Sequence, residues 1–406
     1  MRLARVTLAI LVSAVAIEAA DWPEWRGPHR DGALVNEPKS WPEKLQLKWK
    51  IDVGEGHSSP ILVGATIYEF ARQGDQETIL AINAADGKTR WKQQYPAPVK
   101  VNPAAAAHGP GPKSTPLDSN GKLYTFGLGG ILSCFDAETG KVIWRKDFAG
   151  QYKSGSPVFG TAMSPLADRG LLIAHVGGDH SGALTAFDAA TGEVKWTWDG
   201  DGPSYASPIV VELAGVRQVV TQSQLNIIGV DEATGKLLWK MPFTTSYEQN
   251  IVTPVLYKNT LIFSGLDKGV FAIRLARNGA EISPQKVWET KDASMYMNSP
   301  VLSGDLLFGF SHLKKGQLFC LDAATGETLW AGPPRAGDNA AVLASKSTLV
   351  ALNNEGQLTI ARVDAKSFEV IRQYTVAESP TWAHPLVMSD GVVIKDLKTL
   401  ARWGVD

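Results

Sequence analysis

Eight short polar segments, spaced along the whole chain, carry the side chains that could do chemistry, and each precedes an apolar run. Some of these segments supply carboxylate and amide oxygens, which are the ligands that Ca²⁺ prefers. They predict a metal site built from Glu248, Asn250, Asp338 and Asn339. The other segments supply basic and aromatic side chains and one more amide, which could face an acidic ligand and stack on its rings. They predict a ligand site built from His57, Lys113, Tyr205, Asn298, Trp382 and His384.

Alternatively, the same ten residues could simply be hydrated side chains that line the mouth of a channel. Polar side chains in such a place hydrate the surface and satisfy exposed backbone groups without binding anything. The sequence alone leaves both explanations open. Which of them holds depends on the elements that position the segments.

A nine-residue phrase recurs along the chain and indicates what those elements are. It occupies residues 136–144, 188–196, 231–239 and 322–330, with a fainter copy at 83–91. Its Asp-x-x-Thr-Gly core is a tight-turn signal, because Asp bonds the turn backbone and Gly accepts a positive φ. A tryptophan follows each turn, and the intervals of 42 to 53 residues match a four-stranded propeller blade. These tryptophans are Trp49, Trp91, Trp144, Trp196, Trp239, Trp288 and Trp330.

A second marker gives the blade count, because a Ser/Thr-Pro pair opens an apolar strand about once per period. Six such pairs begin at Ser59, Thr115, Ser164, Ser207, Thr253 and Ser299; His384-Pro385 is a variant, and 339–341 lacks the proline. Only three strands follow Pro385, whereas residues 45–51 form a strand-like segment before the first pair. We therefore predict an all-β, eight-bladed propeller of four-stranded antiparallel blades, in which the N-terminal strand completes the last blade and removes open sheet edges.

The N-terminal region divides into two parts before the propeller of residues 45–406. Arg2 and Arg5 precede an apolar run at 6–17 with small residues after it, which is typical of a signal peptide over residues 1–20. A retained signal anchor is the alternative. Residues 21–44 are expected to form an extension that packs on the propeller. The expected location is periplasmic or secreted, with no membrane span in the mature chain and no lipid anchor, since the leader lacks cysteine.

Composition narrows the classes of partner. The 40 Lys and Arg residues balance 41 Asp and Glu residues, so the formal net charge of −1 gives no electrostatic footprint for nucleic acid. The two cysteines, Cys134 and Cys320, fall in blades that face each other across the ring. They are therefore expected to be free, buried thiols rather than a disulfide.

The repeat at residues 186–196, Ala-Phe-Asp-Ala-Ala-Thr-Gly-Glu-Val-Lys-Trp, resembles that of propellers similar to pyrroloquinoline-quinone (PQQ) enzymes. Residues 22–32 resemble the opening of exported PQQ-like repeat proteins, and the resemblance covers nearly all of the mature chain. It implies that a glycine of one blade docks against a tryptophan of the adjacent blade. The residues implied are the seven tryptophans above with Gly87, Gly140, Gly192, Gly235 and Gly326.

The resemblance leaves two functions open, because this propeller serves both quinoprotein dehydrogenases and the lipoprotein that assists outer-membrane barrel assembly. The leading hypothesis is a monomeric, non-catalytic binding or scaffold protein that meets an envelope protein or small ligand at its rims or mouth. The alternative is a PQQ- and calcium-dependent oxidoreductase, or a PQQ-binding relic, with Asp338 as its candidate catalytic base. An adjacent cysteine pair and a Cys-x-x-Cys-His haem site, both known in that enzyme class, are missing.

Overall fold

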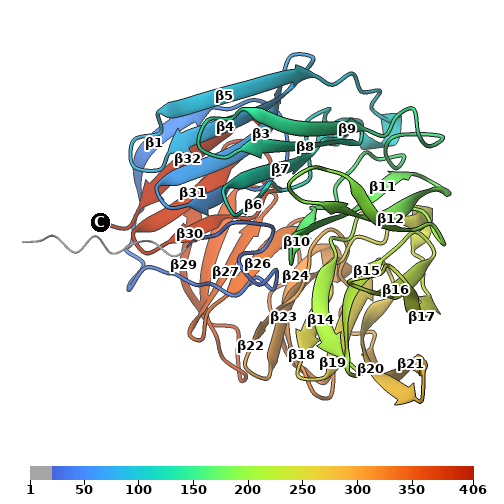
Figure 1. The fold of residues 1–406 in the computed structure, drawn as a ribbon. Helices are drawn as coiled ribbons and strands as arrows, with labels where there is room; N and C mark the ends of the chain where they lie inside the picture. The colour runs from blue at the N-terminus through green and yellow to red at the C-terminus, as the bar shows by residue number, and fades with distance from the viewer. Residues whose placement is uncertain (1–20) are drawn as a thin grey trace, which may run out of the picture.

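The computed structural model describes residues 21–406, and the expected signal peptide lies outside them. The described chain forms eight four-stranded antiparallel sheets arranged as the blades of a propeller (Figure 1). The predicted fold is therefore confirmed. From the innermost strand outward, blades 1 to 4 are β2 (Ile61–Val63), β3 (Thr66–Gln73), β4 (Gln76–Asn83), β5 (Thr89–Pro96); β6 (Leu117–Ser119), β7 (Lys122–Phe126), β8 (Ile131–Asp136), β9 (Val142–Asp147); β10 (Leu166–Asp168), β11 (Leu171–Gly178), β12 (Ser181–Asp188), β13 (Val194–Trp198); and β14 (Ile209–Leu213), β15 (Val216–Gln222), β16 (Asn226–Asp231), β17 (Leu237–Pro242).

The second half of the ring repeats this order. Three short 3-10 turns interrupt the described chain: η1 (Pro103–His108) between blades 1 and 2, η2 (Ser246–Glu248) between blades 4 and 5, and η3 (Leu313–Lys315) within blade 6. The strands of blades 5 to 8 are β18 (Val255–Tyr257), β19 (Thr260–Gly265), β20 (Gly269–Asn278), β21 (Glu281–Thr290); β22 (Val301–Ser303), β23 (Leu306–Ser311), β24 (Gln317–Asp322), β25 (Thr328–Ala331); β26 (Ala340–Ala344), β27 (Thr348–Asn353), β28 (Gln357–Arg362), β29 (Val370–Thr375); and β30 (Leu386–Met388), β31 (Gly391–Lys395), β32 (Thr399–Gly404), β1 (Gln46–Asp52).

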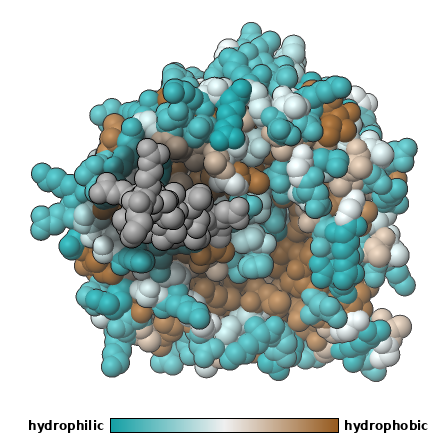
Figure 2. Space-filling model, turned by 60° about the vertical axis from the view of Figure 1, so that its left-hand side comes forward, coloured by the Kyte–Doolittle hydropathy of each residue, from teal (hydrophilic) through white to brown (hydrophobic). Residues whose placement is uncertain are grey.

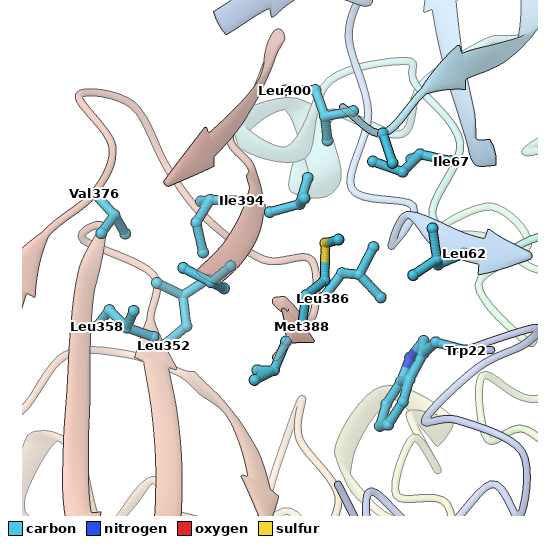
Figure 3. Packing of buried hydrophobic residues seen from close by; sticks show 14 of the residues in the cluster. Trp22, Leu62, Ile67, Leu352, Leu358, Val376, Leu386, Met388, Ile394 and Leu400 are labelled. Carbon is cyan, nitrogen blue, oxygen red and sulfur yellow. The ribbon is translucent and has the colours of Figure 1, made fainter. Parts of the chain in front are cut away.

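The ring closes where its two ends meet, as predicted. Strand β1 pairs antiparallel with β32, and Trp49 lies opposite Arg402 in the register. A hydrophobic cluster fills the junction between blades 7, 8 and 1, and Figure 3 shows Leu352 of blade 7, Leu386 of blade 8 and Leu62 of blade 1 in it. Burial of this cluster joins the two ends of the chain, because apolar area removed from water is the main favourable term.

The repeated turn forms as its residue types require. Asp136 Oδ1 accepts hydrogen bonds from Thr139 N at 2.8 Å and Thr139 Oγ1 at 2.7 Å, and Gly140 adopts φ +73°. The pairing of the following strand, β9, with β8 shifts its register just after Cys134, which lies opposite Trp144. This turn fixes the place of the tryptophan at the blade edge.

A chain of hydrogen bonds, here called the hydroxyl belt, explains the Ser/Thr-Pro marker. Each hydroxyl of the belt accepts a bond from the backbone N–H at the matching position of the preceding blade. The bonds run from His384 N to Ser59 Oγ at 2.9 Å, Ser59 N to Thr115 Oγ1 at 3.4 Å, Thr115 N to Ser164 Oγ at 2.9 Å, Ser164 N to Ser207 Oγ at 3.0 Å, and Thr253 N to Ser299 Oγ at 2.9 Å. The belt ties neighbouring blades together beside the axis.

The described residues before β1 lie against the inner strands (the dark-blue trace near the centre of Figure 1). Trp22 forms a β-bridge with Leu62 of blade 1 and is buried in the cluster at the junction. The Pro23 carbonyl accepts from Asp118 N of blade 2 at 2.8 Å, and Leu34 N donates to Ala344 O of blade 7 at 2.8 Å. The segment therefore touches blades on both sides of the axis.

Two further expectations concern the thiols and the surface. Cys134 and Cys320 are both free and buried, as predicted. Between residues 21 and 406, no helix has the length and apolarity needed to cross a bilayer. Figure 2 shows one face of the molecule, on which hydrophilic residues surround an apolar recess.

Candidate functional site

A cavity of about 210 Å³ lies where the connections between blades converge, and we call it the cup. Four of the sequence-predicted ligand residues line it: His57, Lys113, Tyr205 and Trp382. The connections before the innermost strands of seven blades contribute to its walls. The structure thus brings together residues from blades 1, 2, 4 and 8 that are far apart in the sequence.

The floor of the cup includes Trp25, which comes from the N-terminal extension rather than from a blade. Its indole Nε1 donates to Thr253 Oγ1 of blade 5 at 3.2 Å. Its ring meets the His384 ring of blade 8 edge-on, with 4.5 Å between the centroids. Contacts with two well-separated blades hold this ring in place.

Two buried arginines of the same segment hydrogen-bond to backbone carbonyls of several blades. Arg26 donates from Nη1 to Ser299 O at 3.0 Å and from Nη2 to Pro300 O, both in blade 6. Arg30 donates to Pro208 O of blade 4 and to Pro165 O of blade 3, each at 2.9 Å, and pairs with Glu24 at 2.5 Å. Buried guanidinium groups need such partners, since an unpaired charge is costly to bury. We call residues 22–31 the plug, because they form hydrogen bonds or bridges with blades 1 to 6.

The two histidines of the cup wall are neutral at pH 7. Burial, with a smaller contribution from the neighbouring His108, lowers the pKa of His57 to about 3. Burial and Lys113 lower the pKa of His108 below its usual value. His57 Nε2 lies 3.0 Å from the His108 carbonyl oxygen and donates to it, which fixes the tautomer of His57.

Lys113 is the single cationic side chain among the described lining residues. Its Nζ donates to Phe159 O at 2.8 Å, which leaves two further N–H donors. Burial lowers its pKa to about 8, so the amine is still mostly charged at pH 7. No Asp or Glu lines the described cup, and the positive charge therefore has no counter-ion there.

Two predicted ligand residues lie outside the lining of the cup. His384 is buried. Its backbone N–H donates a hydrogen bond to Ser59 Oγ, and its ring packs edge-on against Trp25. Asn298 is also buried; it donates to Asn339 Oδ1 at 3.2 Å and accepts from Phe310 N at 3.3 Å. Their side chains serve neighbouring elements in this structure.

The predicted metal ligands do not form a shared set of free oxygens. Asn250 Nδ2 donates to three backbone carbonyls and its Oδ1 accepts from Thr245 N, so the amide is fully used. Glu248 bonds Gln224 and lies 3.4 Å from His180 Nε2. Asp338 and Asn339 are held through their backbone N–H groups by Asn354 Oδ1, at 2.9 and 3.1 Å. Across residues 21–406, no three His, Cys, Asp or Glu side chains converge in a metal-binding group.

The residues that line the cup can be compared with the charge and size of PQQ and its calcium ion. PQQ carries three carboxylates, whereas the described lining offers one lysine, two neutral histidines and no arginine. The cavity of about 210 Å³ is also below the roughly 300–1,000 Å³ typical of pockets for drug-sized ligands. The residues of the cup therefore fit this cofactor poorly in both charge and size.

The repeat glycines and tryptophans meet between blades. A Cβ added to the glycine would lie within 2.9 Å of the indole in each of five pairs: Gly87 and Trp49, Gly140 and Trp91, Gly192 and Trp144, Gly235 and Trp196, and Gly326 and Trp288. In each pair the indole Nε1 also donates to a backbone carbonyl of the next blade, at 2.9 to 3.2 Å.

Two of the repeat tryptophans lack such a glycine. Trp330 donates to Asp364 O at 2.8 Å, whereas Trp239 donates to Gln218 Oε1 within its own blade. Blade 5 carries a long hairpin of two ten-residue strands, β20 and β21, instead of the repeat turn that Trp239 would meet.

Sequence reasoning missed several walls of the cup, namely Trp25, Phe159, Gln249 and Tyr296. Trp25 lies in the Trp22–Gly32 opening, which stands outside the repeat and so carries no periodic signal. The sequence signal that could have identified this segment is its two tryptophans close to two arginines, because large side chains outside the repeat must be buried against some other part of the fold.

The fold is that of a PQQ-like propeller, and comparison with known proteins places the chain more closely. The family profile described as "Outer membrane protein assembly factor BamB" matches residues 75–332, so the chain belongs to that family. It is 26% identical to outer membrane protein assembly factor BamB of Shewanella oneidensis, over 53% of this chain and 55% of that protein. It is also 28% identical to quinohemoprotein alcohol dehydrogenase ADH-IIG of Pseudomonas putida, over 38% of this chain and 21% of that protein.

Solved structures agree on the architecture. BamB from Moraxella catarrhalis superposes with a TM-score of 0.62 at 14% identity, covering 89% of this chain and all of that one. Quinohemoprotein alcohol dehydrogenase from Comamonas testosteroni gives 0.65 at 14% identity, with 95% and 80% covered. At this identity the likeness establishes the fold alone, and the sequence matches above span less than two thirds of either curated relative.

Proposed function

We propose that this chain is an exported, monomeric and non-catalytic scaffold that takes part in protein assembly at the outer membrane. The family to which it belongs supports the proposal, since its profile is described as an outer membrane protein assembly factor. The partner would be an envelope protein rather than a nucleic acid, because the charge is balanced at a net −1. The periplasm is the proposed location.

The observation that carries the proposal is an arc of linked turns on the mouth face of blades 3 to 5, which we call the rim arc. Val158 N donates to Asp179 Oδ2 at 3.0 Å, and His180 N donates to Gln224 Oε1 at 2.7 Å. Gln224 in turn donates to Glu248. Hydrogen bonds of this kind hold a surface in one shape, which lowers the ordering cost of binding a protein.

The rim arc displays apolar side chains to solvent. Tyr247 is 81% exposed, and Val158 and Leu225 are 46% and 40% exposed. Tyr247 and Glu248 both adopt left-handed backbone conformations, with φ of 59° and 55°, which non-glycine residues rarely take. Such local strain is concentrated at functional sites, and exposed tyrosines are common anchors of interfaces.

Genetic complementation tests this proposal. Deletion of the gene should lower the amounts of outer-membrane proteins, and the wild-type chain should restore them. Tyr247→Ala at equal cellular level should fail to restore them, whereas Val194→Ala, which trims a 55% exposed side chain on the outer strand β13, should succeed. Unchanged outer-membrane protein amounts in the deletion strain would contradict the scaffold role.

A further inference from the structure

The plug borders the cup, because it contributes the Trp25 side chain to the lining. Trp25 forms part of its floor and Arg26 lies buried beside Trp25. The guanidinium of Arg26 bonds the carbonyls of Ser299 and Pro300, so its charge is already satisfied below the cup. A ligand that enters from the mouth would therefore meet an apolar floor.

The walls suit a flat, apolar body. Phe159 and Tyr205 lie with their ring centroids 6.1 Å apart, tilted by 48°, and His108 meets Trp382 edge-on at 4.8 Å. Tyr296 completes the aromatic lining. Aromatic walls at such angles offer faces and edges to an inserted ring. At about 210 Å³ the cavity has room for a body the size of one aromatic side chain rather than a fused polycyclic ligand.

The charge of the cup is a single amine. Lys113 Nζ keeps two donors after its bond to Phe159 O, and the described lining contains no carboxylate to neutralise it. Charged groups away from bulk water are normally paired, because an unpaired charge loses its hydration. The single Lys113 amine can pair with one negative charge, so it favours a ligand that carries one carboxylate. A ligand with several carboxylates would leave the others without a cationic partner among the aromatic side chains.

We propose that the cup binds a small, ring-bearing monocarboxylate, with the carboxylate on Lys113 Nζ and the ring between Tyr205, Phe159 and Trp382 over Trp25. The carboxylate belongs either to a free aromatic acid or to the C-terminal residue of a polypeptide that ends in an aromatic side chain. This site adjoins the rim arc, since Phe159 and Gln249 of the cup directly follow Val158 and Glu248 of the arc, but it does not rest on the scaffold function.

Calorimetric titration of the mature chain tests the proposal with defined probes. 3-Phenylpropionate should bind saturably, and 3-phenylpropionamide, which lacks the charge, should bind at least tenfold more weakly. Lys113→Met should abolish that tenfold preference and leave the fold intact, because the replaced side chain keeps its length. Lys240→Met, on the exposed part of β17, should retain the preference.

The peptide Gly-Gly-Phe and its amide separate the two sources of the carboxylate. Binding of the peptide acid in preference to the free acid supports a polypeptide C-terminus, and the reverse supports a free aromatic acid. Equal binding of acids and amides, or no binding of any probe at millimolar concentration, would overturn the proposal. Calcium-dependent binding of PQQ that 3-phenylpropionate displaces would overturn it as well, since the size and charge arguments would then fail.

Discussion

The indole Nε1 of Trp25 and the hydroxyl Oγ1 of Thr253 lie 3.2 Å apart, 228 residues from each other in the sequence. Thr253 holds in blade 5 the position that Ser59 and Thr115 hold in blades 1 and 2, where the hydroxyl accepts a backbone N–H of the preceding blade. In blade 5 the Thr253 hydroxyl instead accepts a hydrogen bond from the Trp25 indole of the plug. The N-terminal extension is thus joined directly to the hydroxyl belt.

Arg26 should be a large contributor to stability through the plug. Arg26→Met removes the bonds to Ser299 O and Pro300 O and leaves buried carbonyl oxygens unpaired. Each such loss costs about 1–3 kcal/mol, so we expect the free energy of unfolding in urea to fall by about 3–5 kcal/mol. Arg362→Met, which breaks a solvent-exposed pair with Glu369, should leave the free energy of unfolding almost unchanged. Equal effects of the two variants would refute the role of the plug.

The contact between Gly235 and Trp196 can be tested with a backbone-matched control. Both Gly235 and Gly64 have positive φ, at +71° and +56°, but a Cβ on Gly235 would lie 2.4 Å from the Trp196 ring, whereas Gly64 has no neighbour within 4 Å. Gly235→Ala should therefore destabilise the protein by about 1–3 kcal/mol more than Gly64→Ala. Thermal unfolding of the two variants would measure the difference, and indistinguishable values would show that the ring gives way freely.

Two residues of β1 should differ sharply in their contribution to ring closure. Trp49 is 9% exposed and bonds Ala84 O of blade 1 at 3.1 Å, whereas Leu47 is 50% exposed on the same strand. Trp49→Ala should lower the free energy of unfolding by about 3–5 kcal/mol. Leu47→Ala should change it by no more than about 0.5 kcal/mol. A stable, cooperative Trp49→Ala variant would mean that β1 is dispensable for closure.

The buried His384 predicts how stability depends on pH. Burial, assisted by the charge of Arg26, lowers its pKa to about 3 in the folded state, against about 6.5 when unfolded. Between these values only the unfolded state binds the proton, so stability falls as the pH drops, by up to about 1.4 kcal/mol per pH unit. His384→Gln should weaken this dependence of the free energy of unfolding on pH by the equivalent of one bound proton. Urea unfolding series at several pH values would measure it. An unaltered slope in the His384→Gln variant would contradict burial of His384 as the cause.

The blades and their closure could be predicted because each blade carries its own local signals. The turn Asp136–Gly140 and the tryptophan after it are adjacent in sequence, so their spacing alone gave the period. The shortage of one strand after Pro385 then required a partner from the N-terminal region, and β1 supplies it.

The cup could be predicted only in part, because the repeat gives the order of residues around the axis but not their depth. Lys113 and Tyr205, which the repeat arithmetic assigns to the channel mouth, both line the cup. The same arithmetic could not tell that Asn298 and His384 face neighbouring elements below the cup. It also had no means of finding Trp25, whose partners lie hundreds of residues away and whose segment has no period.

The pairing of β1 with β32 has a consequence for how the protein must be made. Seven blades consist of strands that are consecutive in the chain, so each can form as soon as its own residues have been synthesised. The eighth cannot, because its outermost strand is made first and its other three strands are made last. Until β32 has been synthesised, the hydrogen-bonding edge of β1 has no partner strand, and an unpaired strand edge invites association with other chains. Biosynthesis of this ring therefore includes an interval, nearly the length of the whole chain, in which a chaperone that holds the first strand would be of most use.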